Sequence, residues 1–220
     1  MIHTFEADGI ILEFGTRRIL SDIYFKCETG KIIGILARNG QGKTCLMNIV
    51  YGSLNPESKS TRFDNISVLQ AFKRPDLLTY LPQFNFIPSS LSLKRIFSDF
   101  NLDYKIFENL FPEFKTKHNV IIKNLSGGQR RLVEVYAIIK SNSKFSMLDE
   151  PFSHLMPLQI EKIIEILKIE KQNKGFLITD HMYQHVTNIC DNLYVLTDGK
   201  TYLTKDISDI EKLGYARLQR

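Results

Sequence analysis

Hydrophobic and polar residues alternate in two different ways along this chain. In the first third, β-rich runs at Ile10–Phe14 and Ile19–Phe25 flank the turn-prone Gly15-Thr-Arg, which predicts a hairpin or meander. An unbroken apolar run at 32–37 stops at a charged residue and is typical of a buried strand. A glycine-rich loop and a helical pattern at 43–50 follow it, so the order here is strand, loop, helix.

Helical and strand patterns take turns from residue 130 onward. Three helices, each followed by a short apolar strand, are predicted: 130–140 before 145–148, 158–171 before 176–179, and 182–190 before 193–197. Strands that alternate with helices in this way are typical of a parallel α/β sheet.

The stretch 84–118 differs from its surroundings because phenylalanines are concentrated in it. The residues concerned are Phe84, Phe86, Phe97, Phe100, Phe107, Phe111 and Phe114. Apolar positions recur there at helical spacing, which predicts a small helical insert. We therefore expect one domain over 1–220. Segments 1–83 and 130–220 form its catalytic α/β lobe with an antiparallel N-terminal β subdomain, and 84–129 form the insert.

Composition narrows the class of protein only a little. The chain is 43% hydrophobic and 24% charged, which is ordinary for a globular domain, and no apolar run approaches the ~20 residues of a membrane helix. The N-terminus lacks the pattern of a secretory signal. The net charge of +5 is spread along the chain, so we expect no nucleic-acid partner. Cys27, Cys45 and Cys190 have no metal-binding spacing, which favours a reducing compartment.

A phosphate-binding loop is predicted between the strand at 32–37 and the helix at 43–50. It consists of Ala37, Arg38, Asn39, Gly40, Gln41, Gly42, Lys43 and Thr44. Backbone N–H groups in such a loop, with the helix N-terminus behind them, hold phosphate oxygens. Lys43 is placed to reach the β- and γ-phosphates, and Thr44 to bind Mg²⁺. Ala37 stands where the strict motif has glycine, which costs little unless that position needs a positive φ. The alternative is a simple glycine turn before a helix.

Two acids end the apolar strand at 145–148. Beside a phosphate loop, Asp149 supplies a second contact to Mg²⁺, and Glu150 can polarise the attacking water as a general base. The alternative is a strand that ends in a polar turn.

A second glycine-rich helix start lies upstream of this strand. Leu125 is followed by Ser126, Gly127, Gly128 and Gln129, and then by a helical pattern. N–H groups at such a helix start bind anions. One chain with two phosphate-binding helix ends is most simply explained if each nucleotide lies between two chains.

Taken together over residues 5–204, these motifs resemble those of the ATP-binding subunits of ATP-binding cassette (ABC) transporters. The resemblance implies a P-loop NTPase fold and an ATPase that uses ATP and Mg²⁺. It implies that Phe14 stacks on adenine and that Gln83 links the γ-phosphate and the metal to the insert. It also implies that His181 senses the γ-phosphate and that Ser126, Gly127, Gly128 and Gln129 form the signature that contacts a nucleotide in trans.

The resemblance also implies partners. A second cassette, either an identical chain or a different one, closes on the nucleotides, and separate transmembrane permease subunits dock on the insert. The chain would then lie on the cytoplasmic face of the membrane, held there by the permease. Two alternatives stay open: a soluble ABC-type ATPase outside transport, for example in cofactor assembly, and a non-enzymatic, nucleotide-gated partner.

Two further positions depart from the family pattern. Met156 replaces an Asp that couples the two sites across the dimer, and we hypothesise weaker coupling or a partner that supplies the missing group. Cys45 stands where a Ser or Thr normally touches the α-phosphate. It is either a small residue that fits or, as the sharper alternative, the thiolate of a redox-sensitive site.

Overall fold

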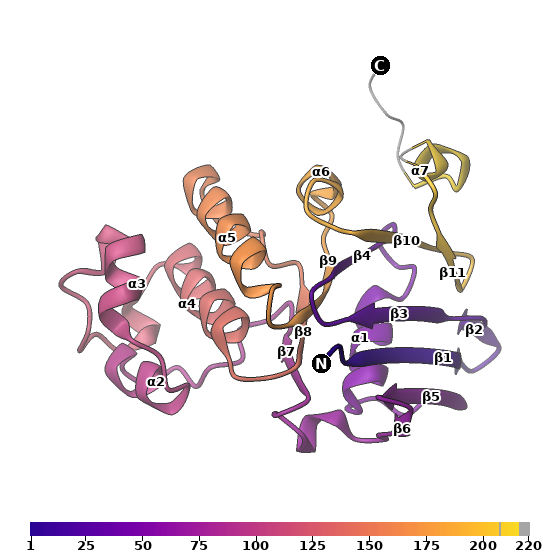
Figure 1. The fold of residues 1–220 in the computed structure, drawn as a ribbon, viewed down its shortest axis with the longest axis horizontal. Coiled ribbons are helices and arrows are strands. Elements are labelled where there is room, and N and C mark those ends of the chain that lie inside the picture. Colours follow the sequence, from indigo (N-terminus) through magenta and orange to yellow (C-terminus); the bar gives the residue numbers. More distant parts are fainter. Residues whose placement is uncertain (207, 216–220) are drawn as a thin grey trace.

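Two sheets with different strand directions form the frame of the molecule (Figure 1). The computed structural model describes residues 1–206 and 208–215. The N-terminal sheet is antiparallel and has the order β2-β1-β5-β6, with β3 also paired to β1. Its strands are β1 (Thr4–Phe14), β2 (Arg17–Leu20), β3 (Tyr24–Glu28), β5 (Ser58–Phe63) and β6 (Ile66–Ser67).

The second sheet has the order β11-β10-β4-β9-β8-β7 and is parallel from β10 to β7, with β11 antiparallel at one edge. Its strands are β4 (Ile32–Leu36), β7 (Leu78–Leu81), β8 (Phe145–Asp149), β9 (Gly175–Thr179), β10 (Asn192–Thr197) and β11 (Lys200–Leu203). The predicted fold class, a mostly parallel α/β sheet with an antiparallel N-terminal sheet, is confirmed.

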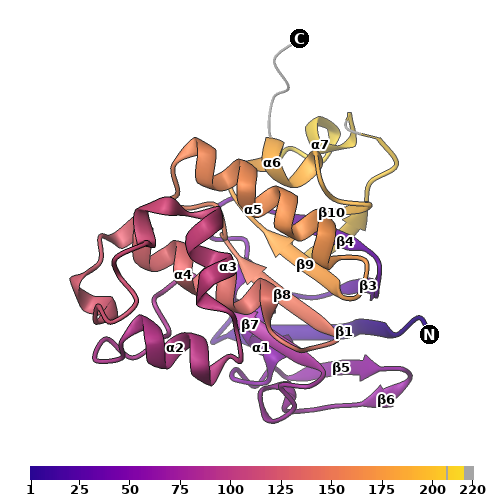
Figure 2. The ribbon, with the colours of Figure 1, turned by 60° about the vertical axis from the view of Figure 1, so that its left-hand side comes forward.

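Helices cover both faces of the parallel sheet, as Figures 1 and 2 show from two sides. The long helices α4 (Gly127–Lys140) and α5 (Pro157–Glu170) and the short α6 (Tyr183–Thr187) share one hydrophobic core with it. Helix α1 (Lys43–Tyr51) lies on the other face, in a second core that it shares with the antiparallel sheet. Residues of β4 alternate between the two cores, so every position of this strand is buried. This arrangement explains its unbroken apolar sequence.

The predicted helices and strands of the parallel sheet are present, with small differences at their ends. Helix α4 begins at Gly127 rather than at residue 130, because Ser126 caps it in a reciprocal pair of hydrogen bonds with Gln129. Helix α6 is shorter than the predicted 182–190. The short helix α7 (Asp209–Lys212) and the single 3₁₀ turn η1 (Ala71–Lys73) were not predicted.

The β-rich run predicted over 19–25 forms parts of two strands. The hairpin turn is present, but the second strand is split into β2 and β3, which pair with different parts of β1. Strand β1 bends where Gly9 has a φ of 59° and where its register shifts after Leu12. Because β1 bends there, the returning chain pairs first with its second half, as β2, and then with its first half, as β3.

A small helical segment lies between β7 and α4 and packs against α4. It consists of α2 (Leu93–Asp99), α3 (Tyr104–Leu110) and the 3₁₀ turns η2 (Pro112–Phe114) and η3 (Ile122–Asn124). Four of its phenylalanines are buried: Phe97, Phe107, Phe111 and Phe114. They share one hydrophobic core with α4 and the parallel sheet, whereas Phe84 is exposed. The division into a lobe of 1–83 and 130–220 and an insert of 84–129 stays a prediction.

Candidate active site

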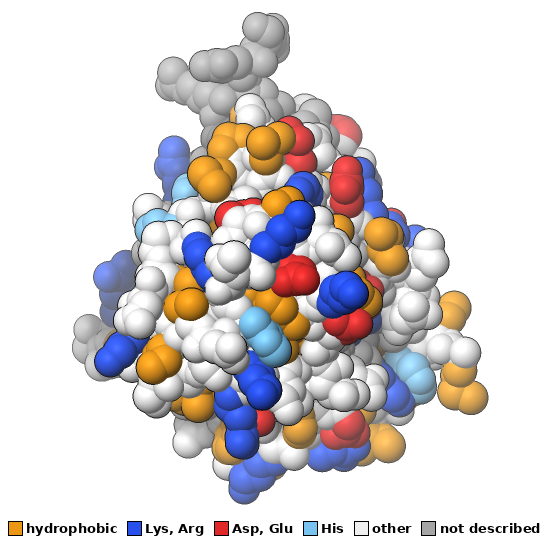
Figure 3. Space-filling view, turned by 90° about the vertical axis from the view of Figure 1, so that its left-hand side faces the viewer, with side chains coloured by type: hydrophobic (Ala, Val, Ile, Leu, Met, Phe, Trp, Pro, Cys, Tyr) orange, Lys and Arg blue, Asp and Glu red, His pale blue; other side chains and the backbone are white. Residues whose placement is uncertain are grey.

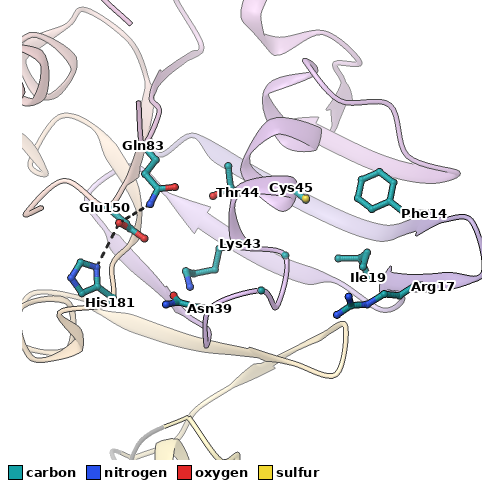
Figure 4. Close-up of a pocket in the computed structure, with 12 residues that line it drawn as sticks. Phe14, Arg17, Ile19, Asn39, Lys43, Thr44, Cys45, Gln83, Glu150 and His181 are labelled. Atoms are coloured by element: carbon teal, nitrogen blue, oxygen red, sulfur yellow. Dashed lines mark hydrogen bonds and ion pairs between the residues drawn. The ribbon is translucent and has the colours of Figure 1, made fainter. Parts of the chain in front are cut away.

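A cleft of about 680 Å³ opens where the antiparallel hairpin meets the carboxyl ends of the parallel strands (Figure 4). Segments far apart in the sequence line it: the hairpin, the loop and first turn of α1, and the loops after β7, β8 and β9. The lining residues are Phe14, Arg17, Ile19, Asn39, Gly40, Gly42, Lys43, Thr44, Cys45, Gln83, Glu150 and His181. Ligands of α/β proteins bind at this end of parallel strands.

The phosphate loop leaves the start of α1 open. Gly42 is the N-cap residue, with a φ of 92°, and no side chain caps the helix. Gly40 also has a positive φ, of 81°. Glycine is the residue that adopts this conformation without strain. A Cβ at position 42 would lie 2.9 Å from Ile19 Cγ2, so this glycine also lets β2 pack against the loop. The free N–H groups of the first turn are thus available to an anion.

Ala37 fits its place in this loop. It is buried, and its φ is not positive, so the conformation that would demand glycine is absent. Its carbonyl oxygen accepts a hydrogen bond of 2.6 Å from Lys43 Nζ, and the Arg38 carbonyl oxygen accepts one of 3.4 Å from the same atom. Lys43 therefore folds back across the loop, and its burial lowers the pKa of the amine, with Glu150 and Asp149 opposing that shift.

Asp149 is buried below the cleft among hydroxyl groups. Thr179 Oγ1 donates to its Oδ1 at 2.6 Å, and Thr44 Oγ1 donates to its Oδ2 at 3.0 Å. Burial raises the pKa of this carboxyl, although both threonine bonds oppose the shift. A buried carboxylate beside a hydroxyl is a set of oxygen donors that a divalent cation prefers and compensates.

Glu150 has a strained backbone and a well-oriented side chain. Its φ is 52°, in the left-handed region that glutamate rarely adopts. Gln83 Nε2 and Ser153 Oγ donate to its Oε2 at 3.0 and 3.3 Å, and His181 Nδ1 lies 3.6 Å from the same oxygen. Figure 4 shows Gln83 and His181 pointing at Glu150 from opposite sides. Strained residues of this kind cluster at functional sites, where the surroundings hold them in place.

Two buried residues that the sequence reasoning missed hold these loops. Arg131 Nη1 donates to the Pro82 carbonyl at 2.7 Å, and its Nη2 donates to the Asp149 carbonyl at 2.7 Å. It thereby ties the segment before Gln83 to the end of β8. Asp180 accepts backbone N–H bonds from two different loops, at 3.1 Å from Phe152 after β8 and at 2.8 Å from Met182 after β9. The only sequence signal for Asp180 was its place next to His181.

The signature residues lie outside the cleft, since none of 126–129 is among the described residues that line it. Ser126 caps α4: its Oγ accepts from the Gln129 N–H, and Gln129 Oε1 accepts from the Ser126 N–H, both at 3.3 Å. A Cβ at Gly128 would lie 2.6 Å from the His154 carbonyl oxygen, whereas nothing lies within 4 Å of one at Gly127. The two glycines therefore have different roles.

Three further residues of the predicted nucleotide site lie in two different clefts. The side chains of Arg38 and Gln41 line a neighbouring cleft of about 500 Å³, with Asp198 and Lys212 on its far side. Cys45 lines the main cleft, and burial raises the pKa of its thiol. Both interpretations of Cys45, as a small residue that fits and as the thiolate of a redox-sensitive site, stay predictions.

Comparisons with known proteins agree with this geometry. The family model described as "ABC transporter" matches residues 20–153. The chain is 28% identical over 214 residues to the "Lipopolysaccharide export system ATP-binding protein LptB" of Haemophilus influenzae, covering 90% of this chain and 88% of that protein. The protein of the same name from Escherichia coli is 28% identical over 211 residues, covering 89% and 88%. A solved "Structure of ATP binding subunit of ABC transporter" has the same fold, with a TM-score of 0.77, 19% identity and coverage of 96% and 95%.

The family match covers most of the chain and spans the phosphate loop, the signature and both acids after β8. The alternatives of an ATPase outside transport and of a non-enzymatic partner are therefore set aside. This chain belongs to the ABC transporter family, as an ATP-binding subunit that hydrolyses ATP.

Proposed function

We propose that two cassettes of this kind close on two MgATP and, on hydrolysis, drive substrate through a separate membrane permease. One observation supports this proposal above the others. The cleft gathers the phosphate loop, Gln83, Glu150 and His181 in one chain, while the signature helix start lies outside it. A second chain can bring its own signature to the open side of the cleft, and two identical chains would then complete two sites.

The residues below the cleft fit a magnesium ion. The Thr44 hydroxyl and the Asp149 carboxylate, which are 3.0 Å apart, would hold it, with Gln83 at the cleft wall. Bound there, Mg²⁺ supplies positive charge that offsets the charge of the phosphates. Lys43 adds a second cation, since its amine needs only to leave the Ala37 carbonyl to reach a phosphate oxygen.

Glu150 is the general base in this proposal. Both hydrogen bonds to its carboxylate end on Oε2, and no described residue donates a hydrogen bond to Oε1. Gln83 and Ser153 therefore orient the group and leave one oxygen to accept a proton from water. His181 lies close enough to sense the charge of Glu150 and of a phosphate beside it. Gln83 connects the same carboxylate to the helical segment that follows it.

The permease is expected to dock on that helical segment. No described helix has both the length and the hydrophobicity that crossing a membrane requires. Figure 3 shows the face of the molecule on this side, where hydrophobic side chains are scattered among basic and acidic ones. Such a mixed surface is typical of the polar interfaces between proteins. The exposed ring of Phe84, next to Gln83, provides an apolar anchor at the edge of the cleft. The chain would thus be held on the cytoplasmic face of the membrane.

The first test is the mass in solution of the Glu150→Gln protein, measured by light scattering with and without MgATP. Removing the base should slow hydrolysis by roughly 10²–10⁴-fold while leaving nucleotide binding intact, so closed pairs should accumulate. We expect a change from monomer to dimer only when ATP is present. The double variant Lys43→Ala/Glu150→Gln is the matched control and should stay monomeric, because it lacks the cation that holds the phosphates.

A dimer that forms equally well without ATP would contradict nucleotide-driven closure. A monomer that binds ATP and never pairs would contradict self-pairing and would assign the second cassette to a different chain.

A further inference from the structure

One basic residue of the cleft has no partner. Arg17 lines the cleft and is exposed, and its side chain makes no hydrogen bond or ion pair with any residue that the structure describes. The adjacent Arg18 differs in this respect, since its Nε donates to Glu13 Oε1 at 2.6 Å. An arginine in a polar cleft whose five N–H donors are all unused is available to bind an anion.

The hairpin fixes the direction in which Arg17 points. Phe14 and Arg17 are directly opposed across the β1–β2 pair, so their side chains emerge on the same face. Ile19 lies two residues further along β2 and therefore on that face as well, where it packs against the phosphate loop at Gly42. Arg17 thus starts about 6.6 Å along the strand from a residue that touches the loop. In Figure 4 its guanidinium points along the cleft toward the phosphate loop.

This position lies between the two ends of a bound nucleotide. The predicted adenine-stacking residue, Phe14, marks one end, and Lys43 marks the end that takes the outer phosphates. The ribose and the α-phosphate must lie between them, beside Arg17, Ile19 and Cys45. Arg17 does not stack on the Phe14 ring, because no cation–π contact joins them among the described residues. Its charge is therefore not committed to the base end.

The side chain that α1 presents to this middle region offers little to a phosphate. Cys45 stands in the first turn of α1 and presents a thiol, which is a weak hydrogen-bond donor. A guanidinium forms paired, charge-assisted hydrogen bonds with phosphate oxygens. We propose that Arg17 binds the α-phosphate of the nucleotide from the hairpin side, as a residue that holds the nucleotide rather than one that acts on the bond that breaks. The proposal rests on ATP occupying this cleft.

The chain itself provides a matched control. Arg18 carries the same charge one residue away, but it points to the opposite face of β2 and is paired with Glu13. Arg17→Ala and Arg18→Ala change the net charge of the protein equally. Any effect that depends only on the overall field of the molecule should therefore appear in both variants.

The test is the dissociation constant of ATP, ADP and adenosine for each variant, measured by calorimetry in the Glu150→Gln background. We expect Arg17→Ala to raise the dissociation constants of ATP and ADP by roughly 10-fold each, because both nucleotides carry the α-phosphate. Adenosine binding and the Arg18→Ala variant should change by less than about twofold. The ATP affinity of Arg17→Lys should lie between those of the protein with Arg17 intact and of Arg17→Ala, since an ammonium keeps the charge and loses the paired geometry. In the active background, KM should rise and kcat should stay nearly constant.

Three results would overturn the proposal. Unchanged ATP affinity in Arg17→Ala would remove the contact. An equal loss of adenosine affinity would show that Arg17 contacts the ribose or the base. An equal loss of ATP affinity in Arg18→Ala would show that the effect comes from long-range charge. Failure of the cleft itself has a separate readout: Lys43→Ala would then bind ATP as tightly as the protein with Lys43 intact.

Discussion

Two helices of this molecule begin at glycine-rich segments, and their first turns are built in opposite ways. Helix α1 starts at Gly42, in a left-handed conformation and without a side-chain cap. Helix α4 starts at Ser126, in an extended conformation and with a complete capping box. Both starts collect N–H groups and the positive end of a helix dipole. In α4 the Gln129 N–H has a side-chain partner, whereas no side chain caps the start of α1.

The difference shows how one chain can contain two anion sites, one that is incomplete without its ligand and one that is stable before the ligand binds. The start of α1 needs a ligand to satisfy its donors, so the phosphate completes the structure of the loop. The start of α4 is already satisfied through the Ser126 oxygen, which accepts from Gln129, while its O–H stays free to donate. The signature helix is therefore stable before a second chain arrives and can still contact a phosphate afterwards.

The two glycines of α4 offer the strongest way to break this comparison. Gly128→Ala should lower the free energy of unfolding by about 1–3 kcal/mol, because the new Cβ meets the His154 carbonyl, which is backbone and cannot turn aside. Gly127→Ala should leave stability unchanged or raise it by up to about 1 kcal/mol, since its Cβ meets nothing. Its ATPase activity should nevertheless fall, because in the proposed pair of cassettes that open space faces the partner's nucleotide. Urea denaturation and phosphate release measure the two effects. Equal stability losses in both variants would refute the distinction.

Met156 offers a second test, at the start of α5. It occupies the N-cap position with extended backbone, but its side chain makes no capping hydrogen bond. Met156→Asp should raise the free energy of unfolding by about 0.5–2 kcal/mol, because a carboxylate can accept a hydrogen bond from the Leu158 N–H in that first turn. If the loop couples the two sites, the cooperativity of turnover with ATP concentration should rise as well. Met156→Ala is the control for loss of the exposed apolar side chain. Higher stability with unchanged cooperativity would support the helix cap and refute the hypothesis that this loop couples the two sites.

The smallest expected effect is at Ala37. Ala37→Gly restores the strict phosphate-loop motif, but it should lower the free energy of unfolding by roughly 0.4–1 kcal/mol, because glycine gives the unfolded chain more freedom. ATP affinity should stay within about twofold, since the φ of Ala37 is not positive. A chemical melt and an ATP titration check the two parts. A gain of several-fold in affinity would show that the methyl group obstructs the loop.

The parallel sheet was predictable because its strands are short, apolar and buried on both faces, as in β4, β8 and β9. Strands β5 and β11 were missed because they are largely polar, and the short apolar β7 was missed as well. Strands β5 and β11 exist through their pairing with β1 and β10, which no local pattern reports.

Sequence motifs named many of the residues that line the cleft, including Lys43, Thr44, Gln83, Glu150 and His181. They did not name Arg17 or Ile19, because both reach the cleft only when the hairpin docks on Gly42. The bends at Glu150 and His154, which have φ values of 52° and 66°, were equally out of reach. Glutamate and histidine give no sign of positive φ, and the hydrogen bonds that hold Glu150 come from Thr179 and Arg131, on other elements.

The order of strands in the parallel sheet determines how late during synthesis the chain can fold. Strand β4, which carries the phosphate loop, pairs with β9 and β10, so that Ile32 lies beside Phe176 and Ile33 beside Asn192. Both neighbours are synthesised long after β4 itself. A nascent chain that has reached only the end of α5 therefore exposes an apolar strand with two free edges, which invites aggregation. Such distant pairing is also slow to form. The ribosome must therefore synthesise β10, which ends at Thr197, before this cassette can take up its first nucleotide.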